Sequence, residues 1–118
     1  MTQKSILIID DDDSVRVAIG SILRLKGYMV DTAENGRDGI AKSSLKRYNL
    51  ALIDFRLPDM DGTKLLTELR SAAPDMVMIM MTGFPSPENR SEAFERFADG
   101  YIVKPVKIDD LLKTVKQR

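Results

Sequence analysis

The chain has 118 residues, with 18 Lys and Arg, 18 Asp and Glu, and neither His nor Cys. A chain of this length forms one domain, and its balanced charge gives no general attraction to nucleic acid or anionic membranes. Without His or Cys it lacks a Ser-His-Asp triad, a thiolate nucleophile, disulfides and the usual zinc ligands. The lack of cysteine, of a long apolar run and of a signal peptide predicts a cytoplasmic location.

Five short apolar segments predict β-strands. Four of them consist mainly of Ile, Val, Leu and Met, as in parallel strands that are buried on both faces. The segment Met29–Ala33 alternates with polar residues, which is typical of an edge strand. In chain order the predicted strands are Ile6–Ile9, Met29–Ala33, Leu50–Ile53, Met76–Met81 and Tyr101–Val103.

Segments with helical spacing alternate with these strands. Apolar residues from Val15 to Leu23 recur every three or four positions, and Gly27 follows as a C-terminal cap. Further helices are predicted over Gly36–Lys46, over Thr63–Arg70 before Pro74, from Ser86-Pro87 through Ala93, Phe94 and Phe97, and near Asp109–Gln117. This alternation predicts an α/β fold with a parallel sheet, whose ligands bind at the carboxyl ends of the strands.

Polar side chains stand at the carboxyl ends of four predicted strands. They are Asp10–Asp13, Asp54, Thr82 and Lys104. Asp12 and Asp13 suit the N-terminus of the next helix, whereas Asp10 and Asp11 precede that helix and favour a site. Asp54 should face the same crevice, and three carboxylates without histidine are hard oxygen ligands suited to Mg²⁺. A hydroxyl and an ammonium at the neighbouring strand ends add a donor and a positive charge.

Four motifs, in their order and spacing, carry a resemblance over essentially the whole chain. They are Ile8-Ile9-Asp10-Asp11, Asp54 within the stretch LALIDFRLPDMDG, Met81-Thr82-Gly83, and Tyr101-Ile102-Val103-Lys104-Pro105. Together they closely resemble the receiver domain of two-component response regulators, in the CheY-like superfamily. The resemblance implies one receiver domain over residues 1–118, with a flavodoxin-like (βα)₅ three-layer sandwich and strand order 2-1-3-4-5.

The resemblance also implies roles for the acidic residues. Asp54 matches the phosphoacceptor, which takes a phosphoryl group from a phosphohistidine of a sensor histidine kinase or phosphotransfer protein. Asp10, Asp11, Asp54 and the backbone carbonyl of Arg56 match the ligands of Mg²⁺. The acyl phosphate then hydrolyses, so the resemblance implies a signalling module that catalyses only its own phosphorylation and dephosphorylation, not an enzyme.

A second group of residues matches the switch of the family. Thr82 matches the hydroxyl that bonds the phosphoryl group, and Lys104 matches the cation that pairs with it. Tyr101 matches the aromatic residue that turns inward on activation, and the Lys104–Pro105 bond is expected to be cis. The fourth helix, fifth strand and fifth helix are then the output surface for a partner, an effector domain or a homodimer. The sequence leaves open whether the chain acts alone or belongs to a longer regulator.

One position departs from the family pattern, and two others bear on its chemistry. Phe97 stands seven residues before Lys104, where the family commonly has glycine. One interpretation places Phe94 and Phe97 in the core, and the other places Phe97 in a partner or dimer patch beside Tyr101. Phe84 and Arg56 each follow a site residue by two positions, and we expect them to influence the lifetime of the phosphoryl group.

Two acidic turn residues and three other functions are also consistent with parts of the sequence. Asp59 and Asp61 lie in a turn-rich stretch, where Asp61 is predicted to cap the next helix. A pseudo-receiver that serves only for interaction is one alternative. A phosphohydrolase with an aspartyl-phosphate intermediate would want an acid where Arg56 stands. A flavin or nucleotide binder would want a glycine- or hydroxyl-rich loop after the first strand, where Asp10–Asp13 would repel phosphate.

Overall fold

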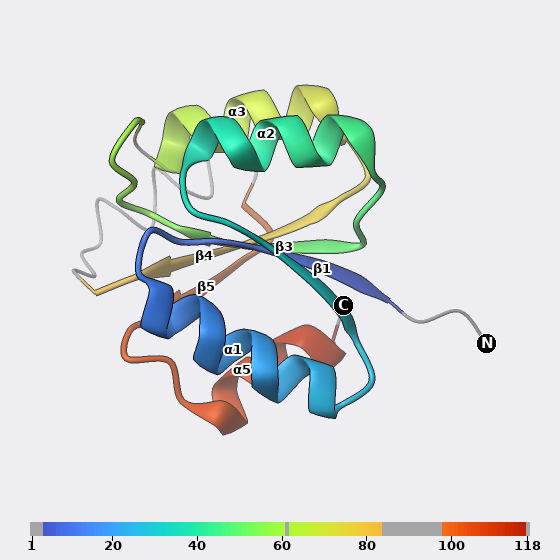
Figure 1. The fold of residues 1–118 in the computed structure, drawn as a ribbon, viewed down its shortest axis with the longest axis vertical. Helices are drawn as coiled ribbons and strands as arrows, with labels where there is room; N and C mark the ends of the chain where they lie inside the picture. The colour runs from blue at the N-terminus through green and yellow to red at the C-terminus, as the bar shows by residue number, and fades with distance from the viewer. Residues whose placement is uncertain (1–3, 61, 84–97, 118) are drawn as a thin grey trace.

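Strands and helices alternate along the chain to build three layers, with the sheet between two pairs of helices (Figure 1). The structure is a computed structural model that describes residues 4–60, 62–83 and 98–117. The strands are β1 (Ser5–Ile9), β2 (Met29–Ala33), β3 (Leu50–Asp54), β4 (Val77–Thr82) and β5 (Gly100–Val103). The helices are α1 (Asp13–Leu25), α2 (Gly36–Leu45), α3 (Gly62–Ala72) and α5 (Ile108–Lys116). The helix predicted from Ser86, with Phe94 and Phe97, lies outside the described residues.

Within the described ranges, the five strands are parallel and lie in the order β2-β1-β3-β4-β5, which confirms the predicted fold. Ile9 pairs with Ala33 of β2 and with Ile53 of β3, and Asp54 pairs with Met81 of β4. β4 begins at Val77, one residue after the start of the predicted apolar segment, and it ends at Thr82, as predicted for this strand's polar end. This register brings the carboxyl ends of β1, β3 and β4 to one edge of the sheet.

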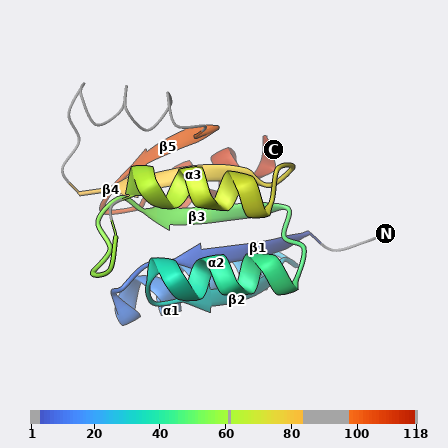
Figure 2. The same cartoon turned by 90° about the horizontal axis from the view of Figure 1, so that it is seen from above.

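Side chains alternate across the sheet and form two apolar cores. The α1–α5 core contains Ile6, Ile8, Ile19, Leu23, Val30, Leu50, Leu52, Ile79, Met81, Ile102, Leu111 and Val115. The α2–α3 core contains Leu7, Ile9, Ala33, Tyr48, Ala51, Ile53, Phe55, Leu65, Leu66, Leu69, Met76, Met78 and Met80. Figure 2 shows α2 and α3 side by side over one face of the sheet. The methionines of β4 are all buried, as expected of a core strand.

The predicted caps of α1 are confirmed. The Asp12 carboxylate accepts hydrogen bonds from the backbone N–H groups of Ser14 at 2.8 Å and Val15 at 3.3 Å. At the other end, Gly27 follows the C-cap residue with φ of 94°, a conformation that other residues rarely adopt. The two caps fix where α1 begins and ends.

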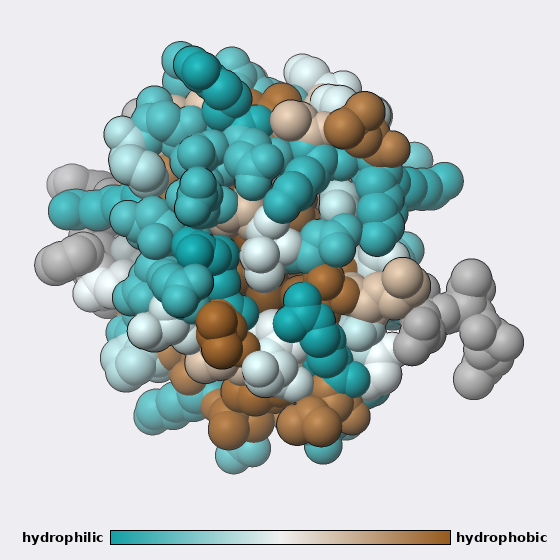
Figure 3. Space-filling view, viewed as in Figure 1, coloured by the Kyte–Doolittle hydropathy of each residue, from teal (hydrophilic) through white to brown (hydrophobic). Residues whose placement is uncertain are grey.

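Basic side chains close the free edge of β2. Met29 and Ala33 form backbone hydrogen bonds with the residues just before and just after β1. Because backbone groups alternate in direction along a strand, the carbonyls of Val30 and Thr32 face outward. Arg24 of α1 donates to the Val30 carbonyl at 3.0 Å, and Lys42 of α2 donates to the Thr32 carbonyl. Hydrophilic residues also dominate the surface over α2 in Figure 3. Cations at a sheet edge oppose pairing with another strand.

We expect the double variant Arg24→Met, Lys42→Met to self-associate through β2, because both outward carbonyls lose their donors while apolar volume is kept. Sedimentation velocity should show larger species than the wild type forms at the same concentration. The matched control is Arg37→Met, Lys116→Met, which removes the same charge from exposed helix positions. Sedimentation indistinguishable from the wild type would contradict this account of the edge.

Candidate functional site

Three charged side chains at the strand ends lie on the same face of the sheet as the core residues two positions before them. Asp10, Asp54 and Lys104 each stand two positions after a residue of the α1–α5 core. Those core residues are Ile8, Leu52 and Ile102. Because the three strand ends lie at the same edge of the sheet, the alternation itself brings the two carboxylates and the ammonium together.

The Lys104 ammonium binds both acids. Its Nζ lies 2.7 Å from Oδ2 of Asp10 and 3.4 Å from Oδ1 of Asp54. Asp10 is completely buried and Asp54 is almost so. Such pairs are strongest where hydrogen bonds satisfy the remaining oxygens, and the Asp12 N–H donates to Oδ1 of Asp10 at 2.9 Å.

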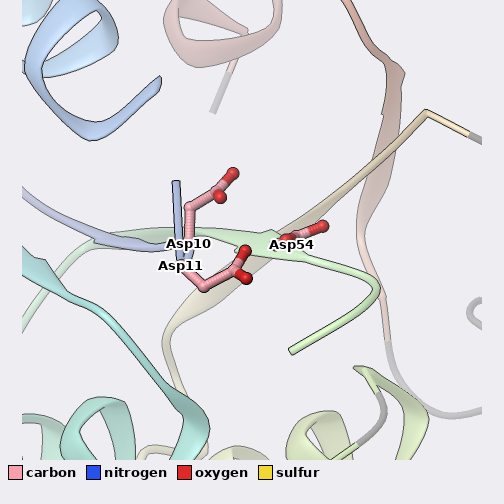
Figure 4. Close-up of side chains that lie close together, drawn as sticks. All are labelled: Asp10, Asp11 and Asp54. Carbon is pink, nitrogen blue, oxygen red and sulfur yellow. The ribbon is translucent and has the colours of Figure 1, made fainter. Parts of the chain in front are cut away.

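Asp11 completes a cluster of three carboxylates, seen at the ends of β1 and β3 in Figure 4. One oxygen from each of Asp10, Asp11 and Asp54 lies within 4.8 Å of the others, and Asp11 is exposed. With all three ionised, Lys104 compensates one negative charge and leaves a surplus of two. Hard oxygen donors with this surplus fit a divalent cation such as Mg²⁺.

Arg16 also belongs to the site, although it was not among the predicted residues. Its guanidinium donates to the backbone carbonyl of Asp10 at 2.6 Å and to the Asp13 carboxylate at 3.0 Å. Arg16 follows Asp13 by three positions, and residues at that spacing face each other on a helix. The spacing was therefore the available signal. The contact holds the chain between β1 and α1 against the first turn of α1.

The surroundings of the cluster change how its members titrate. Burial, reinforced by the negative charge of Asp10, raises the pKa of Asp54 to about 6, while Lys104 and the Arg56 N–H oppose the rise. Burial alone would lower the pKa of Lys104, but the hydrogen bond and charge of Asp10 outweigh it and raise that pKa. Lys104 therefore stays charged at neutral pH, whereas the surroundings of Asp54 disfavour its ionised form.

The structure brings most of the remaining predicted residues close to this cluster. Thr82 is buried beside the Asp54–Met81 pair, and its backbone carbonyl accepts a hydrogen bond from the Lys104 N–H at 2.7 Å. The Arg56 N–H donates to Asp54 at 3.3 Å. Tyr101 is half-buried against the α2–α3 core.

The predicted cis bond between Lys104 and Pro105 is confirmed. The predictions for Phe84, Phe97 and the Asp61 cap lie outside the described residues. Among the described residues, no helix is both long and apolar enough to cross a membrane.

A five-stranded parallel sheet with a buried acid–lysine cluster at its carboxyl edge defines a CheY-like α/β domain. The family model of the response regulator receiver domain matches residues 6–116. The chain belongs to this family and is a receiver domain of two-component phosphorylation signalling. Phosphorylation and Mg²⁺ binding are typical of the family.

Similar proteins agree with this assignment. The transcriptional regulatory protein ZraR of Salmonella typhimurium is 36% identical over 112 residues, which are 95% of this chain and 25% of ZraR. The regulatory protein VanRB of Enterococcus faecalis is 37% identical over 111 residues, 94% of this chain and 50% of VanRB. This chain thus spans a quarter to a half of these relatives.

A solved structure supports the fold independently. The crystal structure of a CheY-like response regulator receiver domain protein from Methanospirillum hungatei JF-1 matches with a TM-score of 0.94 and 42% identity. The match covers 98% of this chain and 93% of that one. The likeness therefore extends over nearly the whole length of both chains.

The raised pKa of Asp54 predicts a pH-dependent cost in stability. Because that pKa is about 6 in the folded chain and near 3.8 when unfolded, the folded state binds more protons between these values. Folding is therefore favoured as the pH falls through this window and opposed above it. We expect Asp54→Asn to exceed the wild type in free energy of unfolding by about 1 to 3 kcal/mol at pH 7.

Urea unfolding in metal-free buffer from pH 4 to pH 8 tests this expectation. The difference between Asp54→Asn and the wild type should shrink toward pH 4, where the wild-type carboxyl is protonated in the folded state. Asp75→Asn, a change at an acid that is 88% exposed, is the matched control and should leave stability nearly unchanged. Equal stability of Asp54→Asn and wild type at pH 7 would refute the assigned cost.

Proposed function

We propose that Asp54 is the phosphoacceptor of this receiver domain and that residues 1–118 act as one signalling unit. The observation that carries the proposal is the placement of the Lys104 ammonium against both Asp10 and Asp54. A carboxylate oxygen of Asp54 forms a bond to phosphorus as the P–N bond of a donor phosphohistidine breaks. The negative phosphoryl group would be repelled by the cluster, and Lys104 reduces that repulsion.

Asp10, Asp11, Asp54 and the backbone carbonyl of Arg56 are the residues that would hold Mg²⁺. When bound, the ion neutralises negative charge and orients the phosphoryl oxygens. The chain supplies the fixed part of the arrangement, because Asp10 is buried and bonded to Lys104 and to the Asp12 N–H. Asp11 is exposed and would supply a further carboxylate oxygen.

Thr82 and Lys104 would report the phosphoryl group to the rest of the domain. The new oxygens on Asp54 attract the Thr82 hydroxyl and the Lys104 ammonium, as phosphate groups attract donors elsewhere. Thr82 also holds the backbone of Lys104, so a shift of one strand end is passed to the other. Tyr101 lies on β5 beside β4 and would follow Thr82 inward.

The output surface is proposed to include β5 and α5. A cavity of about 500 Å³ lies between them, lined by Tyr101, Pro105, Lys107, Asp110 and Lys113 among others. A histidine kinase or phosphotransfer protein would supply the phosphoryl group, and an output protein, an effector domain or a second copy would read it. The fourth helix, Phe97 and the homodimer remain predictions.

Acetyl phosphate tests the phosphoacceptor directly. We expect intact-mass measurement to show one phosphoryl adduct that requires Mg²⁺, because the carboxylate cluster repels the donor without the ion. Asp54→Ala should abolish the adduct. Asp75→Ala should retain it, because Asp75 is an exposed acid that precedes β4 and so lies away from the carboxyl ends of the strands.

The same experiment separates the alternatives. An adduct that persists in Asp54→Ala would assign the phosphoryl group to another residue and contradict the proposal. No adduct in the folded wild type, with rapid quenching to exclude fast turnover, would leave a pseudo-receiver that works by interaction alone.

Thr82→Ala should separate phosphorylation from switching. The variant is expected to form the Asp54 adduct but to lose the phosphorylation-dependent NMR shifts of Tyr101 and α5, because no hydroxyl is drawn toward the phosphoryl group. Thr82→Ser retains the hydroxyl and should restore the shifts. Full shifts in Thr82→Ala would show that coupling runs by another route.

A further inference from the structure

The loop that follows Asp54 is closed at its base and tied to the site. The Gly62 N–H donates to the Phe55 carbonyl at 2.8 Å, so the chain leaves β3 and returns to nearly the same point before α3. Within this loop, the Arg56 N–H donates to the Asp54 carboxylate at 3.3 Å. The loop therefore carries one of its backbone groups to the proposed phosphoacceptor.

The far side of the same loop is bound to the first turn of α2. Oδ1 of Asp59 accepts from the Gly36 N–H and Oδ2 accepts from the Arg37 N–H, both at 2.9 Å. Met60 packs closely on Gly36, where a Cβ would lie 2.7 Å from its Cγ. Figure 2 shows the chain after β3 reaching the end of α2 where that helix begins.

The Asp59 contact is distinct from the N-cap of α2. Asn35 is the capping residue, and its side chain accepts from the Asp38 N–H at 2.8 Å. Asp59 binds two other N–H groups of the same helix end from a loop more than twenty residues away in sequence. Both carboxylate oxygens are used, so the contact fixes the direction of the loop as well as its distance from α2.

We propose that Asp59 is a positioning residue that holds the Arg56 carbonyl in place for the divalent cation. This inference rests on the proposed function, in which that carbonyl is a metal ligand. Arg56 lies between the two anchors of the loop, the Asp54 carboxylate and the Asp59 contact with α2. Because the chain is anchored on both sides of Arg56, its carbonyl loses little conformational freedom when it binds an ion, and this favours binding.

The matched pair Asp59→Ala and Asn35→Ala separates positioning from helix stability. Each variant removes side-chain acceptors from the N-terminus of α2, and only Asp59→Ala releases the loop. Titration with MgCl₂ followed by ¹H–¹⁵N NMR gives the dissociation constant and shows that each variant is folded. Thermal unfolding without metal gives the stability of each variant.

We expect both variants to unfold at lower temperature than the wild type, with only Asp59→Ala weakening Mg²⁺ binding, by about tenfold. Asp59→Asn keeps one acceptor oxygen and should give an intermediate dissociation constant; it also serves if Asp59→Ala does not fold. Equal Mg²⁺ affinity in wild type and the folded Asp59 variants would overturn the inference while leaving the proposed function intact. Equal weakening in Asn35→Ala would also overturn it, by assigning the effect to helix stability.

A wild type that binds no Mg²⁺ in the same titration would instead contradict the metal site of the proposed function, and this inference with it. The phosphorylation of Asp54 by acetyl phosphate is measured separately. The two failures are therefore distinguishable.

Discussion

The contact of one ammonium with two carboxylates is the interaction on which the site depends. Asp10 is completely buried, and an uncompensated buried charge is among the most destabilising features a fold can contain. Lys104 offsets that cost from a strand that lies three positions away from β1 in the sheet order. Burial and the charge of Asp10 raise the pKa of Asp54 because the same contact offsets them only in part, and the two acids together raise the pKa of Lys104. The Lys104 ammonium therefore influences both the stability of the fold and the protonation of Asp54.

The fold could be predicted because hydrophobic patterning determines which segments are buried. Apolar runs separated by helical spacing leave few topologies, and the strand order followed from the resemblance. The convergence of Asp10, Asp54 and Lys104 could also be anticipated, since parallel strands end at one edge. The contact of Arg16 with the Asp10 carbonyl and the contacts of Asp59 could not, because they depend on where loops turn in space. In the sequence Asp59 is one polar turn residue among several. Its partners Gly36 and Arg37 donate through backbone N–H groups, which side-chain identity does not reveal.

The limits of patterning are also visible at β4. The predicted apolar segment begins at Met76 but β4 begins at Val77, since a run of apolar residues does not mark where pairing begins. The confirmed position of Thr82 at the end of β4 matters chemically. With Thr82 inside the strand, its backbone carbonyl is fixed by the Lys104 N–H, so its hydroxyl stands on an element of defined register and not on a loose loop. A hydroxyl that is to respond to a new phosphoryl group is best mounted on an element that moves as a unit.

Each turn of the site is held to another segment of the chain by hydrogen bonds. Arg16 holds the turn after β1 to α1, Asp59 holds the turn after β3 to α2, and the Thr82 carbonyl holds the start of the turn after β5. Each anchor is made to a backbone group of another segment, so none depends on a side chain that the phosphoryl chemistry needs. An acidic cluster without a bound cation would otherwise drive its loops apart. Backbone anchoring lets the charges remain close while unneutralised, so a bound cation relieves the repulsion, and a phosphoryl group, which adds negative charge, draws the nearby donors toward itself.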